Sequence, residues 1–248
     1  MSERGNMERE EFLDDQDPLR HLRSPDADGV LVPAQPPSIL DQRTDLYIPG
    51  INPGDPGITV KLALDAAPGC GGIAWPAGEA SVLSSYLLQR GPSFLRTKTV
   101  LELGSGTGLV GLVAGHIGAE HVWISDQSPL LDIMRQNVRL NSLLSTVTVA
   151  ELNWGDPLPP SIPQKFDVIL AADCVYFEPA FPLLVKTLKD LVPDKSVEVL
   201  FCYKKRRKAD KRFFALLKKE FTWNEVTDDV NRETYTREAI SLLSLVRK

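Results

Sequence analysis

The sequence predicts an α/β fold of the Rossmann-like, doubly wound type, with a seven-stranded, mostly parallel sheet and an antiparallel edge strand. Two observations lead to this prediction. From Pro76 onward, short apolar runs typical of strands alternate with amphipathic runs long enough for helices, an order that builds right-handed βαβ units. The last two apolar runs have no helical pattern between them, so we expect them to pair antiparallel at one edge.

Each expected element is bounded by its own signals. Apolar residues recur at helical spacing after Pro76, and Gly91-Pro92 ends this first helix. Strands are then expected at 99–103, 122–125, 147–151, 166–171, 197–203, 221–226 and 240–246. Helices are expected at 108–117, 129–140, 179–191 and 207–219. Ligands of such sheets bind beyond the carboxyl ends of the strands, so functional side chains should directly follow strands.

The N-terminal part of the chain differs in composition from the rest. Residues 1–65 carry 13 acidic and 6 basic side chains, whereas the remainder carries 20 acidic and 22 basic ones. Residues 1–44 are acidic and lack an apolar period, which predicts a largely disordered extension. Residues 45–248 form the predicted domain, with a hairpin and lead-in at 45–75 and the core at 76–248.

Composition excludes several classes of protein. No apolar run approaches the roughly 18 residues of a membrane span, and the acidic N-terminus lacks the pattern of a secretory signal. The three cysteines are far apart and the three histidines lack metal-ligand spacing, which predicts free thiols in a reducing compartment and no metal site. We therefore expect a cytoplasmic protein. We also expect it to be a monomer. A net charge of −5 disfavours nucleic acid as a partner.

A glycine-rich segment follows the first strand of the alternating pattern. Glycines let the backbone turn tightly and approach a ligand closely, and the helix that follows presents free N–H groups. Asp126, at the end of the next strand, is placed to accept hydrogen bonds from both ribose hydroxyls of an adenosine. The candidate cofactor-binding residues here are Glu102, Gly104, Ser105, Gly106 and Asp126.

A dinucleotide is the competing ligand for this segment. Gly106-x-Gly108-x-x-Gly111 matches the dinucleotide fingerprint. However, a fingerprint that begins at Gly106 would lie inside the predicted helix, and Glu102 places a charge inside the preceding strand. A pyrophosphate needs the helix N-terminus, whereas a methyl-donor nucleoside has no phosphate and tolerates a carboxylate that holds its amino-acid end or orients the loop. The segment therefore favours the methyl donor.

Asp173 directly follows the fourth strand, at the centre of the predicted sheet. Its alternative role, capping the helix that begins near Pro179, is disfavoured by the gap between them. Ala172 would offer its backbone to the donor. Related folds that methylate a planar base amine carry two prolines between the Asp or Asn and the Tyr. The segment Asp173-Cys-Val-Tyr176 lacks them, which argues against a base substrate.

A basic run, Lys204–Lys208, follows the fifth strand and continues through Lys211 and Arg212. Such a run forms a solvated face, docks an acidic or mixed protein surface, or serves RNA binding or nuclear import. Its position on a strand-exit loop favours partner contact.

Four segments together resemble the family-16 protein methyltransferases of the seven-strand class, over about residues 58–248. They are Leu101–Gly111, Trp75-Pro-Ala-Gly-Glu79, Leu152-Asn-Trp154 and Asp173-Cys-Val-Tyr176. The resemblance implies S-adenosylmethionine as cofactor, Trp75 and Trp154 beside it, and Asp173 and Tyr176 as catalytic residues. The residues alone leave an alternative open for each tryptophan: Trp154 packs against the sheet edge, and Trp75 anchors the start of a helix.

The resemblance also implies the substrate, a lysine side chain of another protein. Taken as a whole, the sequence most resembles the fungal members of this family that methylate a lysine of translation elongation factor 1-alpha. Two alternatives remain open from the residues: a methyltransferase acting on a small molecule or RNA, and a non-catalytic module that only binds the nucleoside.

Overall fold

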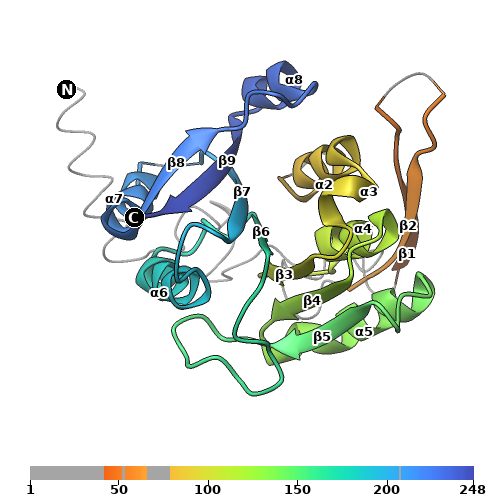
Figure 1. The fold of residues 1–248 in the computed structure, drawn as a ribbon, viewed down its shortest axis with the longest axis horizontal. Helices are drawn as coiled ribbons and strands as arrows, with labels where there is room; N and C mark the ends of the chain where they lie inside the picture. The colour runs from red at the N-terminus through yellow and green to blue at the C-terminus, as the bar shows by residue number, and fades with distance from the viewer. Residues whose placement is uncertain (1–41, 52–53, 66–78, 207) are drawn as a thin grey trace, which may run out of the picture.

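The computed structural model of the 248-residue chain describes residues 42–51, 54–65, 79–206 and 208–248 (Figure 1). The strands are β1 (Gln42–Ile48), β2 (Ile58–Leu64), β3 (Thr99–Leu103), β4 (His121–Asp126), β5 (Val147–Glu151), β6 (Val168–Ala172), β7 (Glu198–Lys204), β8 (Phe221–Glu225) and β9 (Ile240–Arg247). The α-helices are α2 (Glu79–Arg90), α3 (Pro92–Leu95), α4 (Leu109–Ile117), α5 (Leu131–Leu140), α6 (Phe181–Leu191), α7 (Asp210–Glu220) and α8 (Arg232–Arg237). The predicted N-terminal extension lies almost entirely outside the described residues.

Seven strands form one sheet in the order β5-β4-β3-β6-β7-β9-β8. Neighbours from β5 to β7 pair in parallel, whereas β9 lies between β7 and β8 and pairs antiparallel with both. The predicted fold class and the antiparallel pairing of the last two strands are therefore confirmed. The chain extends the sheet from β3 to β5 on one side and then crosses to β6 on the other side of β3. In sheets of this kind ligands bind at such a reversal of strand order, which here lies beyond the carboxyl ends of β3 and β6.

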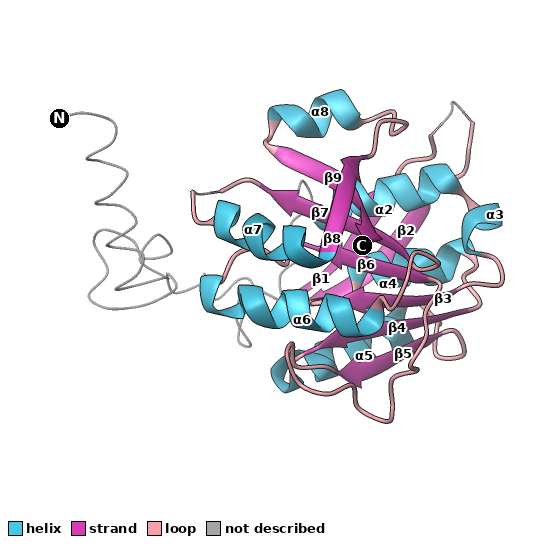
Figure 2. Cartoon of the chain, turned by 60° about the vertical axis from the view of Figure 1, so that its left-hand side comes forward, coloured by secondary structure: helices cyan, strands magenta, loops and turns pink. Residues whose placement is uncertain are grey.

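Helices cover both faces of the sheet (Figure 2). Helices α2, α4 and α5 lie on one face, and α6 and α7 lie side by side on the other. Each face has its own cluster of buried apolar side chains. Strand β6, with the sequence Val-Ile-Leu-Ala-Ala, is buried at every position, as a central parallel strand between two helical layers must be. The core therefore holds the ends of β3 and β6 rigidly.

β1 and β2 pair as the predicted hairpin, although β1 begins at Gln42, inside the segment predicted as an extension. Asn137 of α5 and Asn141, directly after α5, attach the hairpin to the domain. The backbone N–H of Ala63 donates to Asn137 Oδ1 at 2.6 Å, and that of Lys61 donates to Asn141 Oδ1 at 3.0 Å. Both amide side chains also donate back to β2 carbonyls. These buried or partly buried bonds satisfy the backbone groups of Lys61 and Ala63 on the free edge of β2.

The differences from the predicted elements have local causes. The helices expected from 129 and 179 each begin with a 3₁₀ turn, Ser128–Leu130 and Glu178–Ala180, in which a proline without an N–H group occupies the first turn. The short helix α8 was not predicted, because only Tyr235 among its six residues is buried and no apolar period marks it.

Candidate functional site

The segment Gly104–Gly108, here called the glycine loop, joins β3 to α4. Gly104 has a φ of 60°, and a Cβ atom added there would lie 2.9 Å from Trp154 Cζ2 and 3.2 Å from Cys174 Sγ. Glycine is therefore required at this position both for its conformation and for the space it leaves. The glycine loop is packed on one side by an indole ring and a thiol, and its backbone lies directly beyond the carboxyl end of β3.

Asp126 ends β4 and holds the glycine loop from the side. Its Oδ2 accepts the backbone N–H of Gly106 at 2.8 Å, and its Oδ1 accepts that of Gln127 at 2.7 Å. Burial raises the pKa of this carboxyl, although both hydrogen bonds act in the opposite direction. Each carboxylate oxygen has a second lone pair, so Asp126 can accept further hydrogen bonds from a ligand over the loop.

Two serines join the loop to the neighbouring strand. Ser105 Oγ accepts the backbone N–H of Ser125 at 2.9 Å, and Ser125 Oγ donates to the Glu102 carbonyl at 2.7 Å. The backbone N–H of Ser105 donates to the Ser125 carbonyl at 3.0 Å. Both side chains are buried, so these polar groups tie the end of β3 to β4 inside the core.

The Glu102 side chain is 3% exposed and points beneath the start of α4. Its Oε2 accepts the backbone N–H of Gly111 at 2.9 Å. Burial raises the pKa of Glu102 to about 8. Of the two roles expected for this carboxyl, the geometry supports orienting the loop and helix.

Glu102 also bears on which cofactor the loop fits. A bound pyrophosphate relies on the free N–H groups of the first helical turn. Here the N–H of Gly111, in that turn, already donates to a buried carboxyl. The arrangement therefore does not suit the pyrophosphate of a dinucleotide.

Asp173 follows β6 and has a φ of 58°, an unusual left-handed conformation for a residue other than glycine. Its backbone N–H donates to the Cys202 carbonyl of β7 at 3.1 Å. Its Oδ1 lies 2.6 Å from Arg206 Nη1, and the two side chains are 39% and 31% exposed. Helix α6 begins only at Phe181, so Asp173 does not cap it. Such strained residues cluster at functional sites.

The glycine loop and the segment Asp173–Tyr176, here called the Asp173 loop, meet at the reversal of strand order. The buried Cys174 thiol donates to the Leu103 carbonyl at 3.3 Å, directly before Gly104. Ala172, the last residue of β6, is buried, and Tyr176 is 48% exposed. The structure thus brings together predicted site residues that lie about seventy positions apart in the sequence.

The structure describes only one of the two tryptophans that were predicted to border the cofactor. Trp75 lies outside the described residues. Trp154 is partly buried against the apolar cluster between the sheet and α6, and its ring contacts Gly104 from that side. The next residue, Gly155, donates its N–H to Thr187 Oγ1 of α6 at 2.8 Å. Trp154 therefore packs the sheet and supports the glycine loop at the same time.

Sequence reasoning did not single out Arg206. It was predicted only as a member of the basic run, whereas the structure pairs it with Asp173. Arg212 of the same run pairs with Glu178. The available signal was the strand order: β6 and β7 are parallel neighbours, so the residues after both strands lie side by side.

Within the described ranges, no group of three or more His, Cys, Asp or Glu side chains could hold a metal ion. A search of the same ranges finds no helix of the length and apolarity that a membrane span requires.

Known proteins resemble this chain in sequence and in fold. A family model described as lysine methyltransferase matches residues 55–220. The protein-lysine N-methyltransferase EFM6 of Saccharomyces cerevisiae is 41% identical over 247 residues, which cover 89% of this chain and 97% of that protein. The protein N-lysine methyltransferase METTL21A of Danio rerio is 38% identical over 172 residues, 68% of this chain and 78% of that protein.

Among solved structures, the 16S rRNA methyltransferase RsmC of T. thermophilus superposes with a TM-score of 0.54 at 17% identity, covering 83% of this chain and 50% of that one. This likeness concerns the fold alone.

Proposed function

Because the chain belongs to the lysine methyltransferase family, it is a protein-lysine N-methyltransferase, and we propose that its methyl donor is S-adenosylmethionine, bound between the glycine loop and Asp126. The observation that carries this proposal is the Cys174–Leu103 hydrogen bond, which holds the Asp173 loop against the base of the glycine loop. A donor over one loop and an acceptor at the other would then lie within reach of each other.

Each residue of the donor side has a proposed role. Asp126 accepts hydrogen bonds from the ribose hydroxyls, and the backbones of Gly104, Gly106 and Ala172 approach the cofactor closely. Ser105 and Glu102 hold that backbone in place through the bonds described above. Trp154, and Trp75 by family resemblance, border the cofactor. S-adenosylmethionine supplies a methyl group activated by a positive sulfonium.

The acceptor side has to deliver a neutral amine. A lysine has a pKa of about 10.4, so reaching the neutral form at pH 7 costs about 4.6 kcal/mol. A nearby cation and a dry pocket both lower that pKa. We assign Asp173 and Tyr176 to the acceptor: Asp173 accepts an N–H of the amine and takes up its proton, and the Tyr176 hydroxyl orients the remaining N–H. The exposure of both side chains keeps them accessible to a substrate protein.

The proposed substrate is a lysine of a translation factor such as elongation factor 1-alpha. Support for this target comes from the motif resemblance to the fungal enzymes of that specificity, and the yeast relative EFM6 supports protein lysine as the acceptor. We further propose that the protein acts as a monomer in the cytoplasm, where translation factors are found.

The test is radiolabelled methyl transfer from S-adenosylmethionine into a lysate of the source organism lacking this protein. We expect the wild type to label one protein band, and mass spectrometry of the band names the residue. Asp173→Ala should lose about 100-fold or more in turnover while binding the cofactor normally by calorimetry. Asp126→Ala should instead weaken cofactor affinity about tenfold.

Three outcomes would contradict these assignments. Normal turnover of Asp173→Ala would remove Asp173 from the acceptor site, and unchanged cofactor binding by Asp126→Ala would remove the ribose contact. Label that survives protein digestion and remains in RNA would show an RNA substrate. Tight cofactor binding with no labelled product would show a binding module.

A further inference from the structure

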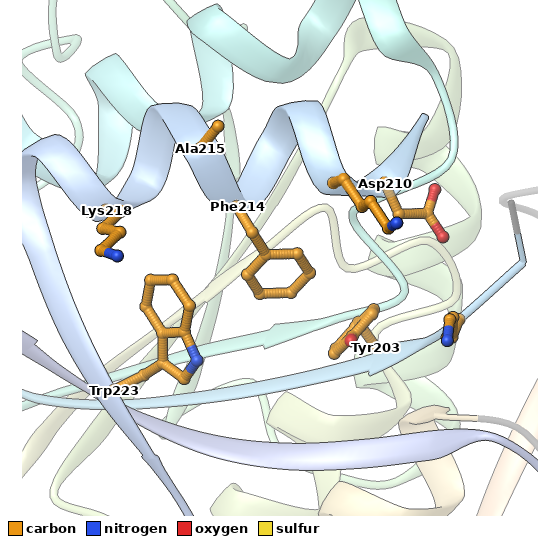
Figure 3. A pocket seen from close by; sticks show the side chains of 8 residues that line it. Tyr203, Asp210, Phe214, Ala215, Lys218 and Trp223 are labelled. Atoms are coloured by element: carbon orange, nitrogen blue, oxygen red, sulfur yellow. The ribbon is translucent and has the colours of Figure 1, made fainter. Parts of the chain in front are cut away.

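A surface hollow lies outside the proposed cofactor site, between α7 and the strands β7 and β8. It measures about 320 Å³ and is lined chiefly by Tyr203, Lys205, Lys211, Phe214, Lys218 and Trp223, which together are here called the aromatic hollow. Figure 3 shows Phe214 projecting from α7 between Tyr203 and Trp223, with Lys218 beside the indole. The volume lies at the lower end of the range for ligand pockets, about 300–1,000 Å³, and suits a single large side chain.

The floor of the aromatic hollow is a row of three rings. The ring centroids of Tyr203 and Phe214 lie 4.7 Å apart, and those of Phe214 and Trp223 lie 5.3 Å apart, with tilted planes. All three rings are only partly buried against the core beneath α7. Partly exposed aromatic rings offer a large apolar area at a low cost in side-chain entropy, and for this reason they are enriched at interfaces.

The rim of the aromatic hollow is basic. The ammonium groups of Lys205, Lys211 and Lys218 form no ion pair within the part of the chain that the structure describes. The acidic groups nearby are already engaged. Asp210 also lines the hollow, but it is buried and accepts the backbone N–H of Arg206 at 2.9 Å, so three lysines at the rim outnumber one carboxylate. Glu225 pairs with Arg232 at 2.6 Å. The rim therefore attracts negative charge.

The aromatic hollow and the proposed acceptor site are linked by two consecutive residues. Lys205 lines the hollow, and the adjacent residue, Arg206, pairs with Asp173. Consecutive Cα atoms are about 3.8 Å apart, so a chain that leaves the Asp173 loop reaches the hollow within a few residues. This link favours an occupant attached to the acceptor lysine, and thus a segment of the substrate protein.

We propose that the aromatic hollow docks an acidic segment of the protein substrate that carries one aromatic or large aliphatic side chain close to the target lysine. This inference rests on the proposed function for the lysine itself. The apolar side chain lies on Tyr203, Phe214 and Trp223, and the neighbouring carboxylates pair with the three lysines. The hollow thus selects the substrate, while the Asp173 loop positions the amine.

The first test uses a defined probe, the peptide Glu-Glu-Phe-Glu-Glu with blocked ends, titrated into the full-length protein. NMR follows the indole N–H signal of Trp223, which is identified by its loss in Trp223→Phe. We expect a saturable shift of this signal that weakens with added salt. The same peptide with Ala in place of Phe should bind at least about fivefold more weakly.

Charge variants decide whether the rim acts as proposed. The triple variant Lys205→Glu, Lys211→Glu, Lys218→Glu should weaken peptide binding by about tenfold or more. Lys219→Glu is the matched control, because Lys219 is exposed on α7 beside Lys218 but does not line the hollow. It should change binding by less than about twofold. An absent shift, or equal weakening by Lys219→Glu, would overturn the proposal, as would an oligouridylate that binds the hollow more tightly than the peptide.

A second measurement separates this inference from the proposed function. With the protein substrate found by radiolabelling, the triple variant should raise KM about tenfold and leave kcat and cofactor affinity unchanged. Unchanged KM, with full activity of the wild type, would overturn the docking role and leave the methyltransferase assignment intact. Failure of the wild type to label any protein would contradict the protein-substrate assignment, while the peptide titration would still report on the hollow.

Discussion

The glycine loop and the Asp173 loop meet at the same edge of the sheet, yet different interactions hold them. The glycine loop is fixed by buried hydrogen bonds from Asp126, Ser105 and Glu102 and is packed against Trp154. The side chain of Asp173 is held by an ion pair with Arg206 that is about one-third exposed. Under the proposed function, the glycine loop would be a rigid donor side and the Asp173 loop an adaptable acceptor side, which suits an enzyme with a constant cofactor and a protein substrate.

This comparison predicts that changes in the glycine loop act on stability, whereas changes near Asp173 act on turnover. Three substitutions test it, in order of decreasing effect on the free energy of unfolding.

Gly104→Ala should have the largest effect. The new Cβ would meet Trp154 at 2.9 Å and Cys174 at 3.2 Å, in a backbone conformation that disfavours side chains. We expect the free energy of unfolding, measured by urea denaturation, to fall by about 3 kcal/mol. Gly118→Ala is the control, because Gly118 also has a positive φ but no atom within 4 Å of its added Cβ. It should cost only about 1 kcal/mol; equal losses would mean that packing against the glycine loop is unimportant.

Glu102→Gln tests the buried carboxyl through its pH dependence. Since folding raises the pKa of Glu102 from 4.5 to about 8, its contribution to stability is greatest below pH 4.5 and decreases as the pH rises towards 8. The slope is at most about 1.4 kcal/mol per pH unit. The glutamine keeps an oxygen for the Gly111 N–H and removes this slope. Urea denaturation of both proteins at pH 6 and pH 8 measures the difference, and parallel pH profiles would refute an ionisable Glu102.

Arg206→Gln should have the smallest effect on stability. The Asp173–Arg206 pair is solvent-screened, so the free energy of unfolding should change by less than about 1 kcal/mol. Turnover should nevertheless fall roughly tenfold, because the carboxylate loses the guanidinium that orients it. Arg206→Lys should restore part of the turnover. A stability loss above about 2 kcal/mol would show that the ion pair supports the fold and would break the comparison.

Much of the candidate site was predictable because strand order follows from local patterns. The apolar run before Asp173 and the glycines after Leu103 placed both loops at the carboxyl ends of central strands. The structure confirms that placement. The role of Arg206 was not predictable, because a basic run looks the same whether its side chains are solvated or paired. The packing of Trp154 under Gly104 was also hidden, since it joins segments that are distant in the sequence.

The sequence by itself determined the fold class, the family and the position of the two loops to which we assign the chemistry, because hydrophobic period, glycine placement and short motifs are local properties. Only the tertiary structure decided which side chains face one another across the reversal of strand order. It paired Asp173 with Arg206, placed Glu102 beneath α4, and assembled Tyr203, Phe214 and Trp223 into one surface. Those contacts join separate elements, and their geometry depends on how the helices pack on the sheet.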